Sequence, residues 1–124
     1  MFDGLRLEHW KTDRRNDGIL LLTLDRSDDS VNALSRAVID ELSSMLERIA
    51  LELPTGVVIR SGKPAGIPGA DIKGFEAIEA KDQVEDWIRL GQLVFQRLAE
   101  LRCPTVMLIH GVCLGGGTEL ALAC

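Results

Sequence analysis

Residues 104–123 have the sequence PTVMLIHGVCLGGGTELALA, which is the most informative part of the chain. The apolar run at 105–109 is rich in β-forming residues and predicts a buried strand. Three consecutive glycines at 115–117 interrupt this pattern, and the Ala- and Leu-rich segment after them has high helical propensity. A strand that leads through a glycine turn into a helix is typical of α/β domains.

Upstream of this stretch, the N-terminal half predicts two strands and a helix. Alternating apolar and polar residues at 5–10 indicate a half-exposed strand, and Asn-Asp-Gly at 16–18 is a hairpin-type turn signal. The apolar run at 19–24 predicts a second strand, buried on both faces. From 31 to 49, apolar residues recur every three or four positions, which predicts an amphipathic helix of about five turns.

The centre of the chain supplies the remaining elements. The apolar run at 57–59 predicts a strand, and the glycine- and proline-rich segment 61–69 predicts a loop or an irregular extended segment. An apolar stripe predicts a helix over 82–100, which Pro104 separates from the strand at 105–109. The order strand, strand, helix, strand, loop, helix, strand, helix favours a single α/β domain. Because no stop signal precedes Cys124, we expect the last helix to be truncated at the C-terminus.

The composition excludes several classes of protein. With 124 residues, 46% of them hydrophobic, the chain has the size and composition of one globular domain. A formal net charge of −5 and a pI of about 5.0 offer no electrostatic footprint for nucleic acid. No apolar run is long enough to span a bilayer. Three cysteines without close pairs argue against a disulfide framework, so we expect a soluble, cytoplasmic protein.

Two glycine-containing stretches, residues 66–73 and 115–119, are the candidate sites. Each carries an extended segment into a helix start, where backbone N–H groups without helical partners can point at a ligand oxygen. Glu119 places a carboxylate beside the second stretch. The alternative is ordinary capping, with Thr118 or Asp71 as an N-cap and no ligand.

Other kinds of site have little support in the sequence. The glycine run lacks the Gly-Lys-Ser/Thr ending of a P-loop, and neither Gly-x-Gly-x-x-Gly nor Gly-x-Ser-x-Gly occurs. The two histidines lie far apart, and the cysteines do not have metal-ligand spacing. We therefore expect no metal site.

Four motifs occur in order along nearly the whole chain: VNALS at 31–35, GIPGADIK at 66–73, PTV at 104–106 and IHGVCLGGGTELA at 109–121. Together they resemble the enoyl-CoA hydratase/isomerase (crotonase) family. Trp87 and residues 94–98 are most similar to the hydratase portion of the multifunctional fatty-acid oxidation α-subunit.

This resemblance implies a fold and a set of site residues. The fold is a right-handed spiral of ββα turns, of which residues 1–124 would be the N-terminal part. Ala70 and Gly116 would supply the two backbone N–H groups of an oxyanion hole. Glu119 would be the first of two catalytic carboxylates, with the second beyond Cys124. Binding of the coenzyme A thioester is implied for Ala70, Asp71, Ile72, Lys73, Gly115 and Gly116.

The same resemblance leads us to expect a hydratase that adds water to 2-enoyl-CoA thioesters in fatty-acid β-oxidation. The alternatives are an isomerase of the same fold and an inactive fragment that binds CoA thioesters. Hydration would need no cofactor, and NAD would be used only if a dehydrogenase domain follows. The expected partners are an acyl-CoA substrate and either further copies of the chain, as a trimer, or a thiolase subunit.

Overall fold

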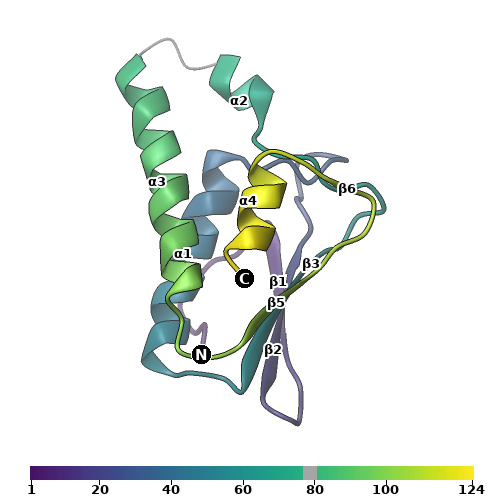
Figure 1. The fold of residues 1–124 in the computed structure, drawn as a ribbon, viewed down its shortest axis with the longest axis vertical. Helices are drawn as coiled ribbons and strands as arrows, with labels where there is room; N and C mark the ends of the chain where they lie inside the picture. The colour runs from purple at the N-terminus through teal and green to yellow at the C-terminus, as the bar shows by residue number, and fades with distance from the viewer. Residues whose placement is uncertain (77–80) are drawn as a thin grey trace.

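Figure 1 presents the computed structural model of the chain, which describes residues 1–76 and 81–124. Within these ranges the main sheet contains β1 (Trp10–Arg14), β2 (Ile19–Leu24), β3 (Gly56–Ser61) and β5 (Thr105–Leu108). Two short strands, β4 (Gly66–Ile67) and β6 (Val112–Cys113), pair separately. The helices are α1 (Arg36–Leu51), α2 (Ile72–Glu76), α3 (Lys81–Ala99) and α4 (Gly116–Leu122).

The main sheet has the strand order β1-β2-β3-β5 and is mostly parallel. β1 and β2 form an antiparallel hairpin, whereas β2, β3 and β5 run parallel to one another. The predicted turn at 16–18 is confirmed, because Arg15 N donates to Ile19 O over 2.9 Å and Gly18 adopts a φ of +85°. The parallel strands are joined by crossovers that contain α1 and α3, as parallel pairing requires.

Helices α1 and α3 lie on the same side of the main sheet (Figure 1). Ser35 is the N-cap of α1, since its Oγ accepts the N–H of Val38 over 3.2 Å. Burial of an apolar stripe, rather than propensity alone, stabilises such helices. The buried residues of α1 are Val38, Ile39, Leu42, Met45, Leu46 and Ile49, and those of α3 are Trp87, Val94 and Leu98.

The outer face of the sheet is more exposed than the sequence predicts. In β2 the face formed by Leu20, Leu22 and Leu24 is buried, but the alternate residues are only half-buried, so the prediction of burial on both faces is wrong. The prediction of a buried strand at 105–109 is also wrong. Val106 and Leu108 are 49% and 51% exposed. β5 is an edge strand, and the helices cover only one face of the sheet.

Two predicted boundaries also differ from the structure near the N-terminus. The strand expected at 5–10 begins only at Trp10, and the backbone N–H groups of Glu8 and His9 instead donate to the carboxylate of Glu41 on α1. The helix expected from 31 begins at Arg36. Of the apolar residues before it, Leu34 is buried in the core but Val31 is 36% exposed, so the helical period at 31–35 does not mark a helical turn.

Within the segment 61–69, Ser61 ends β3 and Gly66–Ile67 form the short strand β4, and the rest is a loop, as expected. Periodicity could not find a strand of two residues, because such a strand is defined by its partner β6 and not by its own pattern. In the described part of the chain, no helix has both the length and the apolar character needed to cross a membrane.

Candidate functional site

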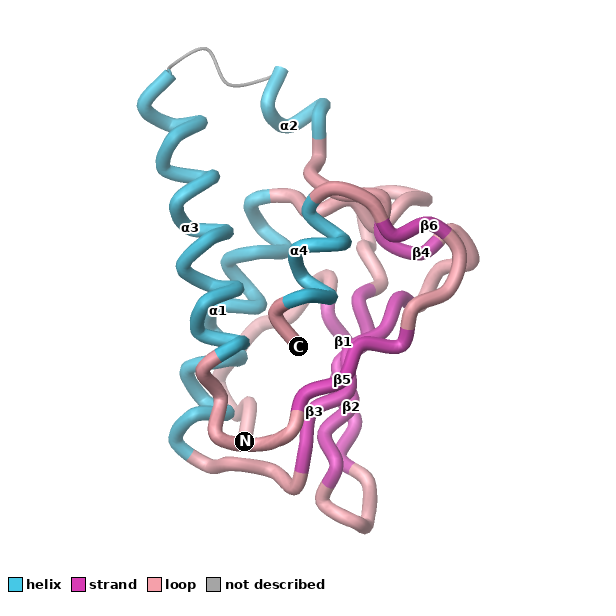
Figure 2. The backbone as a smooth tube through the Cα atoms, viewed as in Figure 1, coloured by secondary structure: helices cyan, strands magenta, loops and turns pink. Residues whose placement is uncertain are grey.

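The two glycine-containing stretches lie side by side because the strands that precede them pair. β4 and β6 are parallel, with Gly66 opposite Val112 and Ile67 opposite Cys113. Both strands lead through a glycine with positive φ, at Gly69 (+128°) and at Gly115 (+48°). Figure 2 shows the two chain segments leaving this strand pair together and continuing to α2 and α4. The structure therefore brings the candidate segments into one place.

A bridge between Leu34 and Ala70 determines where the amide of Ala70 points. Leu34 N donates to Gly69 O over 2.7 Å, and Asp71 N donates to Leu34 O over 3.2 Å. In a trans peptide, the N–H points opposite to the C=O of the same plane. Since Gly69 O faces Leu34, the N–H of Ala70 faces away from it. No described residue accepts a hydrogen bond from this N–H.

Gly116 brings the second amide next to the first. A Cβ placed on Gly116 would lie 3.5 Å from Ala70 N, and one placed on Gly69 would lie 3.4 Å from Gly116 N. The main chains of the two loops thus lie so close together that a side chain at Gly69 or Gly116 would fill the space between them. Gly116 is the first residue of α4, and its N–H, like that of Ala70, has no hydrogen-bond acceptor among the described residues.

Both loops border a cavity of about 210 Å³. Its polar edge is formed by Ala70, Gly116 and Glu119, the three residues assigned a catalytic role by the family resemblance. Its other walls come mainly from the segment before α1, from α1 and from α3, and they are mostly apolar. These walls are lined by Leu34, Ile39, Trp87, Ile88, Gly91, Gln92 and Phe95. The arrangement suits a molecule with an apolar chain attached to a polar, hydrogen-bond-accepting group.

Glu119 lies in the first turn of α4, and its side chain is exposed at the edge of this cavity. Within residues 1–76 and 81–124, no hydrogen bond or ion pair holds its carboxylate. The carboxylate is therefore available to a molecule in the cavity. The N-terminal end of a helix also favours a negative charge nearby.

The capping alternative holds for one of the two loops. Asp71 Oδ1 accepts the N–H of Gly74 over 3.2 Å, so Asp71 caps the start of α2. Thr118 does not cap α4, because its Oγ1 donates to Cys113 O over 3.0 Å. The N-cap of α4 is Gly115, which makes no side-chain capping bond. Capping therefore accounts for Asp71 and leaves the amide of Gly116 without a partner.

The remaining predicted site residues lie outside the lining of the cavity. Asp71 points to the other side of its segment, where its carboxylate forms an ion pair with Arg26 over 3.0 Å. Ile72 is 70% exposed and Lys73 is exposed as well. Gly115 shapes the turn before α4. These four residues adjoin the cavity without contributing to its walls.

Sequence reasoning missed Arg26, whose side chain is only 5% exposed. Its Nε and Nη2 donate to the two carboxylate oxygens of Asp28 over 3.0 and 3.2 Å. This pairing raises the pKa of Arg26 above its ordinary value and lowers the pKa of Asp28. A single arginine in a polar turn shows no periodicity and belongs to none of the quoted motifs, so nothing in the pattern marks it.

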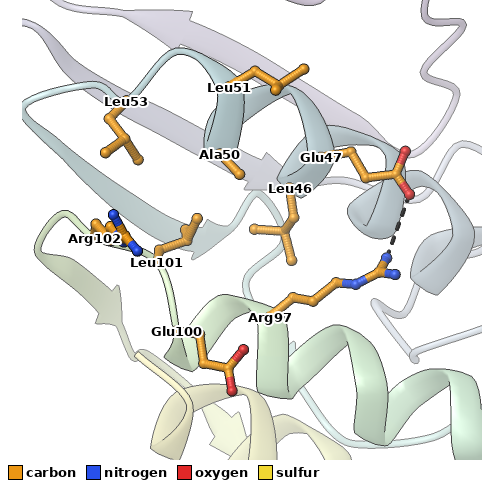
Figure 3. A pocket seen from close by; sticks show the side chains of 9 residues that line it. All are labelled: Leu46, Glu47, Ala50, Leu51, Leu53, Arg97, Glu100, Leu101 and Arg102. Carbon is orange, nitrogen blue, oxygen red and sulfur yellow. Dashed lines mark hydrogen bonds and ion pairs between the residues drawn. The ribbon is translucent and has the colours of Figure 1, made fainter.

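A larger cavity, of about 560 Å³, lies at the C-terminal ends of α1 and α3 (Figure 3). It is lined by Leu46, Glu47, Ala50, Leu51, Leu53, Arg97, Glu100, Leu101 and Arg102. Arg97 is engaged with Glu47 over 3.4 Å, and neither glycine loop contributes to the lining. Because neither loop lines the larger cavity, the smaller cavity is the better candidate site.

Among the described residues, no group of three His, Cys, Asp or Glu side chains could hold a metal ion.

Comparison with known proteins supports the family resemblance. Residues 14–124 match the family model described as enoyl-CoA hydratase/isomerase. The chain is 40% identical over 112 residues to the fatty acid oxidation complex subunit alpha of Idiomarina loihiensis. It is 42% identical over 113 residues to the subunit of the same name from Shewanella amazonensis. The alignments cover 89% and 90% of this chain but only 16% of each relative.

Solved structures confirm the expected α/β, crotonase-like fold. Enoyl-CoA hydratase from Bacillus anthracis superposes with a TM-score of 0.86 at 28% identity, covering 94% of this chain and 45% of that one. The enoyl-CoA hydratase of Mycobacterium smegmatis gives a TM-score of 0.86 at 26% identity, covering 93% and 45%. The chain thus spans less than half the length of these structures. By its motifs, its fold and the family model that it matches, the chain belongs to the enoyl-CoA hydratase/isomerase family.

Proposed function

We propose that the protein from which this chain comes hydrates 2-enoyl-CoA thioesters in fatty-acid β-oxidation. The observation that carries the proposal is the cavity bordered by Ala70, Gly116 and Glu119. At its edge lie two backbone N–H groups without an acceptor among the described residues, and one carboxylate. Relatives named as fatty acid oxidation complex alpha subunits support the metabolic context.

In the proposed reaction, the two amides stabilise the charge that develops on the thioester oxygen. Water adds to C3 of the conjugated acyl group, and the electron pair of the C=C bond moves towards that oxygen to give an enolate. The N–H groups of Ala70 and Gly116 donate to the oxygen. Removal of one such donor typically lowers the rate by about 10²–10³.

Glu119 is proposed as the base that takes a proton from the attacking water. Its carboxylate lies at the cavity edge and has no partner among the described side chains that would compete for this role. General base catalysis of this kind contributes about 10²–10⁴ to a rate. The enolate must then be protonated at C2, a step that we propose for the second catalytic carboxylate, which the family resemblance places beyond Cys124.

The rest of the substrate would lie along the outside of the same segment. The exposed residues Ile72 and Lys73, with Asp71 and Gly115 beside them, are proposed to contact the coenzyme A part of the thioester. The apolar walls that α1 and α3 provide would hold the acyl chain. This division matches a substrate with one apolar end and one highly polar end.

The proposed reaction needs no cofactor, and NAD would serve only a dehydrogenase domain elsewhere in the protein. The proposed partners are a CoA thioester together with either identical subunits, as a trimer, or a thiolase subunit. Cys103, Cys113 and Cys124 are free thiols, as a reducing, cytoplasmic compartment would keep them.

The test is the Glu119→Gln substitution in the intact gene product, assayed with crotonyl-CoA by the loss of conjugated C=C absorbance. The amide would keep the shape of the side chain but could not accept the proton, so turnover should fall by at least about 10²-fold. Turnover equal to wild type would refute the role of Glu119. Movement of the double bond in a 3-enoyl-CoA without hydration would indicate the isomerase alternative. Calorimetric binding of a CoA thioester without turnover would indicate a binding protein.

A further inference from the structure

The buried side chain of Arg26 joins the two segments that form the Leu34–Ala70 bridge. Arg26 follows β2, and its Nη1 donates both to Ala33 O over 3.2 Å and to Asp71 Oδ2 over 3.0 Å. Ala33 and Asp71 are the direct neighbours of the two bridged residues. One guanidinium nitrogen therefore reinforces the contact on which the direction of the Ala70 amide depends.

The guanidinium itself has little freedom to move. Its remaining bonds hold the carboxylate of Asp28 in a two-point contact, which fixes the plane of the guanidinium group. The backbone of Arg26 is held as well, because its N–H donates to Asn32 Oδ1 over 2.9 Å and its carbonyl accepts from Lys63 Nζ over 2.9 Å.

The contacts of Arg26 with Ala33 and Asp71, called the Arg26 clamp below, are connected to the main sheet through Asn32. Asn32 is fully buried and donates through Nδ2 to Leu24 O over 2.6 Å and to Ser61 Oγ over 2.8 Å. Leu24 and Ser61 are the last residues of β2 and β3. The position of the guanidinium is therefore set by the ends of two core strands.

Residues 69–71, which Arg26 holds in place, include a glycine whose neighbouring peptide plane could otherwise rotate. Gly69 has a φ of +128°, in a region open to glycine, and glycine allows rotation of the following peptide plane at little steric cost. A rotation of the Gly69–Ala70 plane would turn the N–H of Ala70 away from the cavity. Asp71 resists this motion through three contacts: its N–H to Leu34, its Oδ1 to Gly74 and its Oδ2 to Arg26.

We propose that Arg26 is a positioning residue that, through Ala33 and Asp71, keeps the amide of Ala70 directed into the cavity. The proposal rests on the proposed function, since it assigns Arg26 to the oxyanion-binding amide of that same site. Arg26 does not line the cavity and touches no substrate in this role. Its effect is to hold one hydrogen-bond donor at the place where the thioester oxygen gains charge.

The test measures polarisation of the thioester carbonyl directly. The intact gene product is mixed with butanoyl-CoA labelled with ¹³C at the thioester carbonyl, which has no conjugated double bond and therefore cannot be hydrated. The infrared stretch of the bound carbonyl should move to lower frequency in wild type, because two N–H groups withdraw electron density. In Arg26→Met this movement should shrink, and kcat with crotonyl-CoA should fall about 10²-fold, the loss that a small misplacement causes.

Two further variants separate positioning from general destabilisation. Arg26→Lys keeps the charge but not the planar fork, so it should restore part of the frequency shift and part of kcat. Arg15→Met is the matched control, since Arg15 pairs with Asp17 in the β1–β2 turn and should leave both quantities unchanged. If Arg26→Met does not fold, Asp71→Asn carries the test, because it weakens the contact to Arg26 and keeps the side-chain shape.

The outcomes distinguish the two proposals. A folded Arg26→Met protein with the wild-type carbonyl shift overturns the positioning role, whether kcat falls or not. Wild-type protein that hydrates crotonyl-CoA and shifts the carbonyl, together with a reduced shift in the variant, supports it. Wild-type protein that does neither overturns the proposed function, and the role of Arg26 with it.

Discussion

The α-carbon of Gly117 packs directly against the carbonyl oxygen of Ile67, so a Cβ on Gly117 would overlap that oxygen. The contact holds the first turn of α4 against β4. The neighbouring Gly116 is different, because a Cβ there would meet the flexible end of Leu34 at 3.1 Å and Ala70 N at 3.5 Å. Adjacent glycines in one turn thus have different surroundings, and we expect substitution of each to have a different effect.

Gly117→Ala should damage the fold. The added methyl group would collide with a main-chain atom of β4 that is tied into the β4–β6 pair, and overpacking of this kind destabilises by about 3 kcal/mol. Urea denaturation followed by circular dichroism measures the change. An unfolding free energy within about 0.5 kcal/mol of wild type would contradict this close packing.

Gly116→Ala should keep the fold and lose activity. The methyl group can be accommodated by a small shift of the Leu34 side chain, yet it would occupy the space beside the Ala70 amide where a thioester oxygen is proposed to bind. We expect kcat with crotonyl-CoA to fall about 10²-fold or more, as for loss of an oxyanion-binding donor. Thermal unfolding close to wild type is the control, and normal turnover in the folded variant would count against the site.

Asn32→Ala should destabilise the protein without any direct contact to the cavity. The buried amide accepts from Arg26 N and donates to Leu24 O and Ser61 Oγ, and its removal breaks all three bonds. Leu24 O keeps a bond from Gly62 N, and Ser61 Oγ keeps its bonds to the segment that follows β3. At roughly 1 kcal/mol for each lost bond, the expected cost is about 3 kcal/mol. The matched control is Asn16→Ala in the exposed hairpin turn, which should change stability by less than about 0.5 kcal/mol.

Asp25 should contribute to stability only above acidic pH. Lys11 and Lys63 each donate to one of its carboxylate oxygens over 2.8 Å, and these bonds lower the pKa of Asp25 from 3.8 to about 2. Because the folded-state pKa lies below the unfolded one, the contribution is complete above about pH 4 and is lost as the pH falls towards 2.

The measurement for Asp25 compares urea unfolding of wild type and Asp25→Asn at several pH values. The difference in unfolding free energy should be largest near neutral pH and should decrease between about pH 4 and pH 2. A difference that stays constant across this interval would mean that the lysine contacts do not favour the ionised carboxylate.

Much of the fold and part of the candidate site can be predicted from local pattern. The helix at 82–100 and the strands at 19–24 and 57–59 are found because their periodicity and punctuation are contained in the segments themselves. The glycines at 115–117 point correctly to a strand-to-helix turn. Ala70, Gly116 and Glu119 come from family resemblance, and the structure lines one cavity with all three.

What could not be predicted depends on contacts between distant segments. Exposure of Val106 and Leu108 follows from the edge position of β5, and strand order is not written in the strand itself. The β4–β6 pair and the clamp by Arg26 likewise join residues far apart in the chain. A local sequence pattern contains information only about residues close in the chain. The motifs of the candidate site can therefore be recognised in the sequence, but the long-range contacts that support it cannot.

The pairing of β4 with β6 also determines when the candidate site can form during synthesis on the ribosome. Gly66 and Val112 can meet only after the whole of α3 and β5 has emerged, so the amides of Ala70 and Gly116 stay apart until then. Such non-local parallel pairing forms slowly, because a long loop must close first. A nascent chain can therefore fold its first hairpin and α1 early and still lack the paired amides, at which a thioester oxygen is proposed to bind, until residues 112–116 have been synthesised.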